Sequence, residues 1–369
     1  FSNGMQIINT PGTIIDWNSF SIEAGKTVRF DQTFANSAIL NRVTGQSASD
    51  ILGTLQSNGR VFLINPNGII FGAGSKVDTA GFIASTLNIS NEDFLAGKYH
   101  FQCNNSTTCD AGVDVLNPTN QRIILKNGSE ITTRTAGNGG QVWLIARDRV
   151  ISEKGSKIDA PSGQVIAAAA REVSVTSPSF GQMRFTLNGI TSSKIDLAGD
   201  IKVERGAAGF FADTVRLAGK VQAFSEKDAA GQITAQAATD VLVEDDARLS
   251  VSGVDGADAG AIRLTAGRRI KVAASTEIAA DGGDAGGQAG KGGLIDFRAA
   301  AVNLPSTIPL LFASPNVHAL GYGKEGLELS RFGRIQVTET GTFTTQVLSG
   351  PSWHSESDSF YDYAQGSQG

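Results

Sequence analysis

Two short apolar runs flank a four-residue turn in the stretch Gly59-Arg60-Val61-Phe62-Leu63-Ile64-Asn65-Pro66-Asn67-Gly68-Ile69-Ile70-Phe71-Gly72. Residues 61–64 and 69–71 are each the length of a strand and are rich in β-branched and aromatic side chains. Asn65 can bond to the backbone ahead of it, Pro66 fixes its own φ, and Gly68 suits the last position of a type I turn. A helix cannot run through Pro66 without losing a backbone hydrogen bond. The stretch therefore predicts a strand, a tight turn and a second strand.

A glycine, a variable residue and an apolar run recur along the chain after about residue 116. This unit occurs at residues 140–146, 163–168, 181–185, 231–235, 260–264 and 333–337. Second strands are expected at residues 149–151, 172–175 and 240–243, and third strands at residues 156–159 and 247–251. The steps from glycine to glycine are roughly 18 to 33 residues, which is typical of a solenoid.

Three short strands per repeat with glycine corners suit one rung of a parallel β-helix. Each strand of such a rung buries alternate residues inside the coil and pairs with the rungs above and below. At about 22 residues per rung, the chain would form on the order of 15 rungs. A β-sandwich is the alternative, but its strands return by hairpins, and two-residue Asn-Gly or Asp-Gly hairpin loops are not the rule here. The sequence therefore predicts an all-β solenoid.

Two segments have helical rather than strand spacing. Residues 47–55 place a serine at a possible N-cap and three apolar residues on one face, although a glycine interrupts them. Residues 90–96 offer a serine or asparagine cap and two acidic residues in the first turn. Each segment predicts a short helix at most.

The composition narrows the classes of protein. Of the 369 residues, 44 are glycine, 9 are proline and 18% are charged, which favours many short strands over long charged helices. The net charge of −5 gives no basic surface for nucleic acid, so no nucleic-acid partner is expected. No apolar run approaches the roughly 18 residues of a membrane span. Residues 1–13 lack the basic start and apolar core of a signal peptide.

The chain has two cysteines, Cys103 and Cys109, in a short polar segment. Their spacing is too wide for a CxxC zinc or redox pair, and no histidine partners them nearby. A disulfide that closes this small loop is the favoured interpretation and implies an oxidising compartment. Two free thiols in a cytosolic protein are the alternative. No metal site is expected.

The first hundred residues resemble the secretion domain of two-partner-secretion exoproteins, the family of filamentous haemagglutinin and the high-molecular-weight adhesins. Besides the Asn-Pro-Asn-Gly turn, the resemblance rests on three pieces that occur in the family's order. They are Ile14-Ile15-Asp16-Trp17-Asn18-Ser19-Phe20-Ser21-Ile22, Ile39-Leu40-Asn41-Arg42-Val43-Thr44-Gly45 and Gly81-Phe82-Ile83-Ala84-Ser85-Thr86-Leu87. The resemblance is dense from about residue 14 to about residue 99. Beyond that, only the repeat style continues.

This resemblance implies a fold, a function and a set of site residues. The fold would be a right-handed parallel β-helix with an N-terminal cap and small extra-helical strands. Asn65, Pro66, Asn67 and Gly68 would form the motif for secretion or partner recognition, with Asn41 and Arg42 in support. The partner would be an outer-membrane β-barrel transporter with periplasmic recognition modules. The chain would cross the periplasm unfolded and reach the outside of the cell as part of a large secreted or surface-bound adhesin or haemagglutinin, a class associated with virulence.

The expected division of the chain follows from the motifs and the repeats. Residues 1–115 would be the secretion-domain core with its cap, and residues 116–345 would continue the rungs. Residues 346–369 form a polar tail that predicts an extended or disordered segment. The resemblance also implies that Phe1 is not the native start.

Two other classes of function remain as alternatives. The rungs could be a binding module for a host glycan, protein or haem carrier. A polysaccharide-active β-helix enzyme needs clustered carboxylates on one face. The only tight acidic run is Glu244-Asp245-Asp246, and successive strand residues point to opposite faces. The glycine-rich residues 280–293 lack the pattern of a phosphate loop and predict a loop between rungs. The sequence indicates neither an enzyme nor a cofactor.

Overall fold

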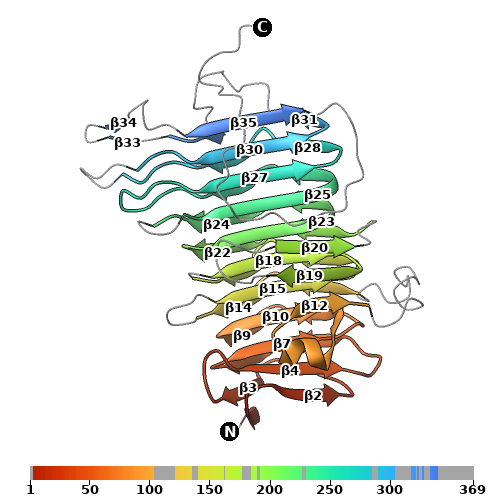
Figure 1. The fold of residues 1–369 in the computed structure, drawn as a ribbon. Coiled ribbons are helices and arrows are strands. Elements are labelled where there is room, and N and C mark those ends of the chain that lie inside the picture. The colour runs from red at the N-terminus through yellow and green to blue at the C-terminus, as the bar shows by residue number, and fades with distance from the viewer. Residues whose placement is uncertain are drawn as a thin grey trace. The chain divides into compact units, whose positions relative to one another are not determined.

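The computed structural model describes residues 3–103, 121–134, 140–161, 163–176, 184–188, 192–226, 230–284, 290–303, 317–320, 322–323, 326–327 and 333–339. Strands dominate these residues, with one short helix (Figure 1). They group into two compact units, one ending at Asp200 and one beginning at Ile201. The predicted boundary between residues 115 and 116 and the predicted tail at residues 346–369 lie outside the described residues.

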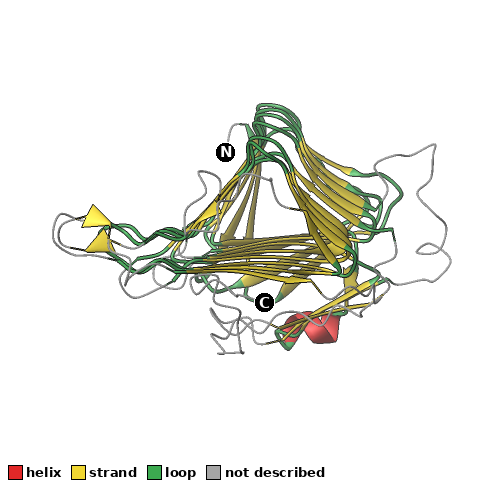
Figure 2. Ribbon diagram, turned by 90° about the horizontal axis from the view of Figure 1, so that it is seen from above, coloured by secondary structure: helices red, strands yellow, loops and turns green. Residues whose placement is uncertain are grey.

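The first unit is a coil of three parallel sheets, which we call walls 1, 2 and 3 (Figure 2). Wall 1 contains β2 (Thr13–Trp17), β4 (Ala38–Val43), β7 (Arg60–Ile64), β10 (Gly81–Ser85), β15 (Gln141–Ala146) and β18 (Gln164–Ala169). Wall 2 contains β5 (Ser49–Ile51), β8 (Ile69–Phe71), β13 (Arg122–Leu125), β16 (Arg149–Ser152) and β21 (Lys194–Leu197). Wall 3 contains β1 (Gly4–Asn9), β3 (Thr27–Gln32), β6 (Thr54–Ser57), β9 (Lys76–Thr79), β14 (Glu130–Thr133) and β17 (Lys157–Asp159).

The core of this unit lies inside the coil. Alternate residues of each strand point inward, so residues in register stack along the coil. Val61, Phe82, Val142 and Val165 form one such row in wall 1 and are all buried. Phe71 of wall 2 meets Phe82 across the interior with ring centres 5.7 Å apart. Aromatic rings from two walls thus fill the space between them.

The outward face of wall 1 is also apolar and is covered by an extra-helical layer. This layer is an antiparallel sheet of β11 (Asn88–Ile89), β12 (Tyr99–Gln102), β19 (Glu172–Thr176) and β20 (Arg184–Asn188), with helix α1 (Asn91–Leu95) beside it. The outward row of wall 1 is Leu40, Phe62, Ile83, Trp143 and Ile166. Phe62 packs on Phe94 of α1 at 5.1 Å, and Trp143 packs on Tyr99 of β12 at 4.9 Å. From β4 to β18, wall 1 therefore buries apolar residues on both faces.

Two expectations about local structure were wrong. Residues 47–55 form β5 and β6 rather than a helix, because Ile51 and Leu55 both enter the core of the coil. Residues 172–175 are not a rung strand but belong to β19 in the extra-helical sheet, where they pair antiparallel with β12. The alternating pattern of β19 suits either place, so the sequence alone could not distinguish them.

The expected second helix is present. Helix α1 begins after Ser90, whose side-chain oxygen accepts a hydrogen bond from the backbone N–H of Asp93. Glu92 and Asp93 lie in its first turn, where their charges favour the helix N-terminus.

The second unit repeats the same three-walled rung. Its first two walls are made by β23 (Ala207–Leu217), β25 (Gln232–Val243), β27 (Ala261–Ala266), β28 (Arg269–Val272), β30 (Leu294–Ala299), β31 (Ala301–Asn303) and β35 (Arg334–Glu339). Its third wall contains β22 (Asp200–Glu204), β24 (Lys220–Phe224), β26 (Arg248–Ser250), β29 (Glu277–Ala279) and β32 (Val317–His318). A small antiparallel pair, β33 (Tyr322–Gly323) and β34 (Gly326–Leu327), is separate from the walls.

The recurring glycine has a steric cause. A Cβ on Gly163 would collide with the carbonyl oxygen of Gly140 one rung earlier, and a Cβ on Gly260 would collide with that of Gly231. That same carbonyl oxygen accepts the N–H of the residue after the glycine, as in Ala261 N to Gly231 O at 3.1 Å. At these positions a rung can lie this close to the previous one only because it starts with a residue that lacks a side chain. The repeats at residues 140, 163, 231, 260 and 333 all start strands as expected, and residues 181–183 lie outside the described residues.

We expect Trp143→Ala to lower the free energy of unfolding by about 3–5 kcal/mol, because the fully buried indole leaves a cavity between wall 1 and β12. Trp143→Phe should cost much less, since it keeps a ring against Tyr99 and removes an indole N–H that has no hydrogen-bond partner among the described residues. Ile8→Ala is the matched control, because Ile8 is 81% exposed and should change the free energy by about 0.5 kcal/mol at most. Chemical denaturation measures all three, and equal losses for Trp143→Ala and Ile8→Ala would contradict the described packing.

Candidate functional site

The Asn-Pro-Asn-Gly turn connects β7 of wall 1 to β8 of wall 2. The N–H of Gly68 donates to the carbonyl oxygen of Asn65 at 3.1 Å, which closes the turn as the sequence predicts. The N–H of Asn67 donates to Oδ1 of Asn65 at 2.9 Å, so the Asn65 side chain forms an Asx turn within it. Gly68 has a φ of 108°, a value that side chains disfavour. The residue types at positions 65–68 therefore suit the backbone conformation and hydrogen bonds of this turn.

Asn65 also fastens the turn to the previous rung. Its side chain is completely buried, and Nδ2 donates to the carbonyl oxygen of Ser47 at 3.0 Å and to Oγ of Ser49 at 2.9 Å. Its backbone N–H donates to the carbonyl oxygen of Ser85 on the next rung at 2.9 Å. Both amide hydrogens and the amide oxygen of Asn65 are thus used within the chain.

Asn67 makes a second link to the same part of the previous rung. Its Nδ2 donates to the carbonyl oxygen of Gly45 at 2.8 Å and to Oδ1 of Asn65 at 3.1 Å. Pro66 is the exposed residue of the turn, and its carbonyl oxygen accepts from Gln121 N at 3.3 Å. Two side-chain amides therefore join the turn to residues 45–49, while the proline ring faces solvent.

Sequence reasoning missed the residues that receive these amides. The sequence predicts Ser47 as a possible helix cap, whereas in the structure its carbonyl and the hydroxyl of Ser49 accept hydrogen bonds from Asn65. The signal available was spacing, because these residues precede Asn65 by 18 and 16 positions, close to one rung.

Asn41 and Arg42 on β4 hold different parts of the first unit together. Buried Asn41 accepts from Nε1 of Trp17 at 3.0 Å and donates to the carbonyl oxygen of Phe62 at 3.3 Å, which joins three successive rungs of wall 1. Arg42 donates to Oδ1 of Asn88 and to the carbonyl oxygen of Ile89, both at 2.9 Å. It therefore fixes β11 of the extra-helical sheet to wall 1.

Arg42 also contacts two further groups. It donates to Oδ1 of Asp16 at 3.0 Å and to Oδ1 of Asn91, the first residue of α1, at 2.9 Å. No hydrogen bond among the described residues joins Asn41 or Arg42 directly to the Asn-Pro-Asn-Gly turn. Both residues support the framework around the turn rather than the turn itself.

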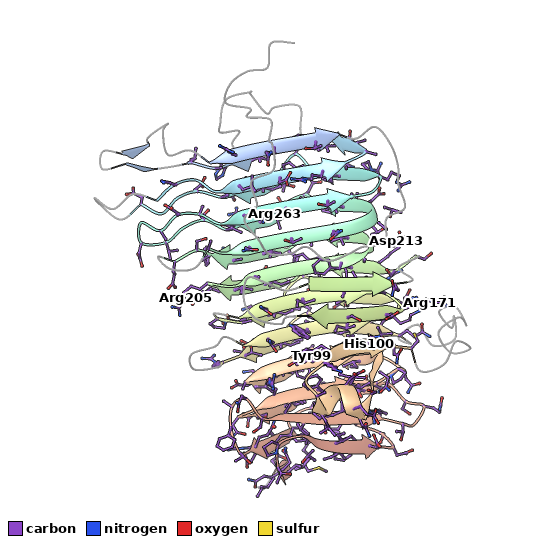
Figure 3. The ribbon with its side chains drawn as sticks, viewed as in Figure 1. Tyr99, His100, Arg171, Arg205, Asp213 and Arg263 are labelled. Carbon is purple, nitrogen blue, oxygen red and sulfur yellow. The ribbon has the colours of Figure 1, made fainter. Side chains whose placement is uncertain are left out.

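A second charged cluster ties the extra-helical layer together. His100 lies on β12 (Figure 3). Its ring is 2.9 Å from Oε1 of Glu172 on β19 and 3.7 Å from Oδ2 of Asp93 on α1. The Asn188 amide, and after it the His100 ring, lower the pKa of the Glu172 carboxyl through their hydrogen bonds. These side chains bind one another, which suits a structural role.

The cysteine pair was the other site predicted from the sequence. Cys103 follows β12, but Cys109 lies outside the described residues, so their pairing stays a prediction. Within the described ranges, no group of three His, Cys, Asp or Glu residues could hold a metal ion. No described helix has the length and apolar character needed to cross a membrane.

Comparison with known proteins decides the family. The family model of the TPS secretion domain matches residues 2–223. The chain belongs to this family. Two heme/hemopexin-binding proteins of Haemophilus influenzae are similar to it, one with 50% identity over 80 residues and one with 40% identity over 87 residues. These matches cover 22% and 24% of this chain and 9% of each relative, so the chain spans under a tenth of the relatives' length.

A solved structure supports the fold. The crystal structure of the HMW1 secretion domain from Haemophilus influenzae aligns with a TM-score of 0.66 and 21% identity, covering 94% of this chain and 92% of that one. The right-handed parallel β-helix is confirmed, and so is the resemblance to two-partner-secretion domains. The TPS secretion domain is the secretion domain of a large exoprotein that is exported and is secreted or displayed on the surface.

We expect Asn65→Ala to lower the free energy of unfolding by about 2–4 kcal/mol, since the buried Ser49 hydroxyl, the Ser47 carbonyl and the Asn67 N–H all lose their Asn65 partner. Asn65→Asp should cost at least as much, because a carboxylate oxygen would face the Ser47 carbonyl in a buried place. Asn127→Ala is the matched control, since Asn127 is exposed and its side chain forms no hydrogen bond with a described residue. Urea denaturation compares the three variants. An Asn65→Asp variant as stable as Asn127→Ala would show that the amide contacts do not matter.

We also expect protein from an oxidising compartment to carry a bond between Cys103 and Cys109. The bond would contribute about 2 kcal/mol in the chain-entropy model, so Cys103→Ser should still fold. Intact mass with and without reductant measures the pairing, and two thiols that alkylate freely without reductant would contradict it.

Proposed function

We propose that this chain delivers its exoprotein to an outer-membrane β-barrel transporter with periplasmic recognition modules, and that the Asn-Pro-Asn-Gly turn serves export through folding. The observation that supports this proposal is that the Asn65 amide is fully buried and uses all its hydrogen-bonding groups within the chain. In the folded domain, no part of that amide is therefore available for binding by a partner. The motif acts by closing one rung on the previous one.

The spacing of the contacts supports this role. Asn65 and Asn67 reach back 18 and 22 residues to the previous rung, so the corner can close as soon as residue 68 has emerged. Contacts between neighbouring rungs close only short loops and allow the coil to grow in order. Burial of each new rung then makes backward movement through the transporter unfavourable.

The test is co-expression with the transporter, measuring exported against periplasmic protein. We expect Asn65→Ala, Asn67→Ala and Asn65→Asp each to lower export sharply, while Asn127→Ala exports normally. Normal export of both alanine variants would show that the turn has no role in export beyond connecting two strands, and would overturn the proposal.

Melting temperatures separate folding from recognition. Trp143→Ala destabilises the first unit without touching the turn, so it provides the needed comparison. If folding is the cause, export should fall with melting temperature along one line for Trp143→Ala and the asparagine variants. Asparagine variants that export far worse than Trp143→Ala at equal stability would show that the transporter reads the amides directly.

The activity of the parent protein is a separate proposal. The relatives' name concerns haem and hemopexin, and we infer that the parent is a surface exoprotein that binds a host component, either as an adhesin or as a haem-carrier-binding protein. Because only 9% of each relative is matched, we place that binding outside the present chain. The purified chain should therefore not bind haem-loaded hemopexin or any member of a glycan panel. Saturable binding would show that the binding site lies in the rungs of this chain.

A further inference from the structure

The Asn-Pro-Asn-Gly turn contains a dipeptide with its own chemistry, Asn67-Gly68. In such a pair the backbone nitrogen of glycine can attack the side-chain amide carbon of asparagine. Ammonia leaves as a cyclic imide forms, and water then opens the imide to aspartate or isoaspartate. Glycine favours the attack because no Cβ hinders the approach of its nitrogen. We propose that Asn67 is a deamidation site which folding shields, so that its conversion records the time the chain has spent unfolded.

Both reacting groups are held in the folded turn. The attacking nitrogen belongs to Gly68, which is buried and donates its hydrogen to the carbonyl oxygen of Asn65 at 3.1 Å. The amide under attack belongs to Asn67, whose Nδ2 is bonded to Gly45 O at 2.8 Å and to Asn65 Oδ1 at 3.1 Å. Attack requires all three hydrogen bonds to break. The reaction therefore needs at least local opening of the corner.

Two of the five other Asn-Gly pairs in the sequence give an internal comparison. Asn58 in Asn58-Gly59 is held in the same manner, because its amide exchanges two hydrogen bonds of 2.7 Å with the backbone of Gln32. Asn127 in Asn127-Gly128 is exposed and its side-chain amide has no hydrogen bond to any described residue, although the Gly128 N–H donates to the carbonyl oxygen of Gly155 at 3.2 Å. One hydrogen bond rather than three opposes the reaction there, so folding should shield Asn58 and Asn67 far more than Asn127.

The product would not fit the corner. A carboxylate at position 67 has no hydrogen to donate, and it would stand against two acceptors, the Gly45 carbonyl and Oδ1 of Asn65. An isoaspartate would also lengthen the main chain within a turn whose ends β7 and β8 fix in register with their neighbours. A converted chain loses the hydrogen bond from residue 67 to Gly45 and places a charge beside the Asn65 amide that holds Ser47 and Ser49.

The consequence for export rests on the proposed function. A chain that waits unfolded exposes Asn67-Gly68 to conversion, and a converted chain cannot close the corner. Prompt export and folding protect the residue, whereas delay inactivates it. The turn then limits how long an unexported chain stays competent.

The test uses purified chain without any transporter, so its result is independent of whether the domain delivers an exoprotein. Native and urea-unfolded samples are incubated at mildly alkaline pH, and peptide mapping follows conversion at Asn58, Asn67 and Asn127. We expect conversion of Asn127 in both samples and of the other two only when unfolded. For Asn67 the unfolded rate should exceed the native rate by more than about tenfold, since even local opening of a packed corner is unfavourable. Native conversion of Asn67 as fast as that of Asn127 would overturn the shielding.

A second measurement tests the consequence. Unfolded, aged protein is returned to native conditions and digested with protease, and the resistant fraction is mapped. Chains converted at Asn67 should be depleted from that fraction, while chains converted at Asn127 should be retained. As a direct check, Asn67→Asp should lower the melting temperature and Asn127→Asp should not. If chains converted at Asn67 refold with unchanged stability, the proposal is wrong.

Discussion

A coil of short parallel strands turns three times in every rung, and several of these turns bury a polar side chain, among them Asn65, Ser129 and Ser156. Those groups must find partners inside the chain, because a buried donor or acceptor without one costs more than a typical hydrogen bond contributes. Ser129 and Ser156 solve this at wall 3 by donating to the carbonyl three residues earlier, both at 2.7 Å. Asn65 solves it at the corner between walls 1 and 2 by reaching into another rung. The corner thereby becomes a joint between rungs.

The stacking of rungs also explains the recurring glycines and the burial of wall 1 on both faces. Rungs lie in register, so residues at equivalent positions meet one another along the whole unit. Where backbone meets backbone, as at Gly140 and Gly163, a side chain has no room. Where large apolar residues stack outward, as at Phe62 and Trp143, a second layer must cover them. The extra-helical sheet and Arg42 supply that cover and its attachment.

Much of this architecture could be predicted from the sequence. The turn at residues 65–68, the glycine-led strands and helix α1 all have strong local causes, namely fixed φ values, steric exclusion and an N-cap. The failures lie where local pattern is shared by two structures. Residues 47–55 have helical spacing, yet a glycine and the core of the coil favour strands. The strand β19 has the alternation of a rung strand and lies outside the coil. Likewise, nothing local shows that Ser47 and Ser49 receive the Asn65 amide, because that contact depends on the register of two rungs.

The extra-helical sheet has an implication for the order of events at the cell surface. Its strands come from two distant parts of the chain, and His100 meets Glu172 across 72 residues of sequence. Phe62 and Trp143 are covered by Phe94 of α1 and Tyr99 of β12, but β12 itself keeps one unpaired edge until β19 arrives. Until residues 172–176 have emerged, the incomplete coil therefore presents an open sheet edge that can pair with another chain. During that interval, a nascent domain that is far from other copies does not aggregate, whereas several that emerge close together can adhere to one another. Crowding at the exit, rather than the stability of the finished coil, would then limit how densely such domains can be delivered.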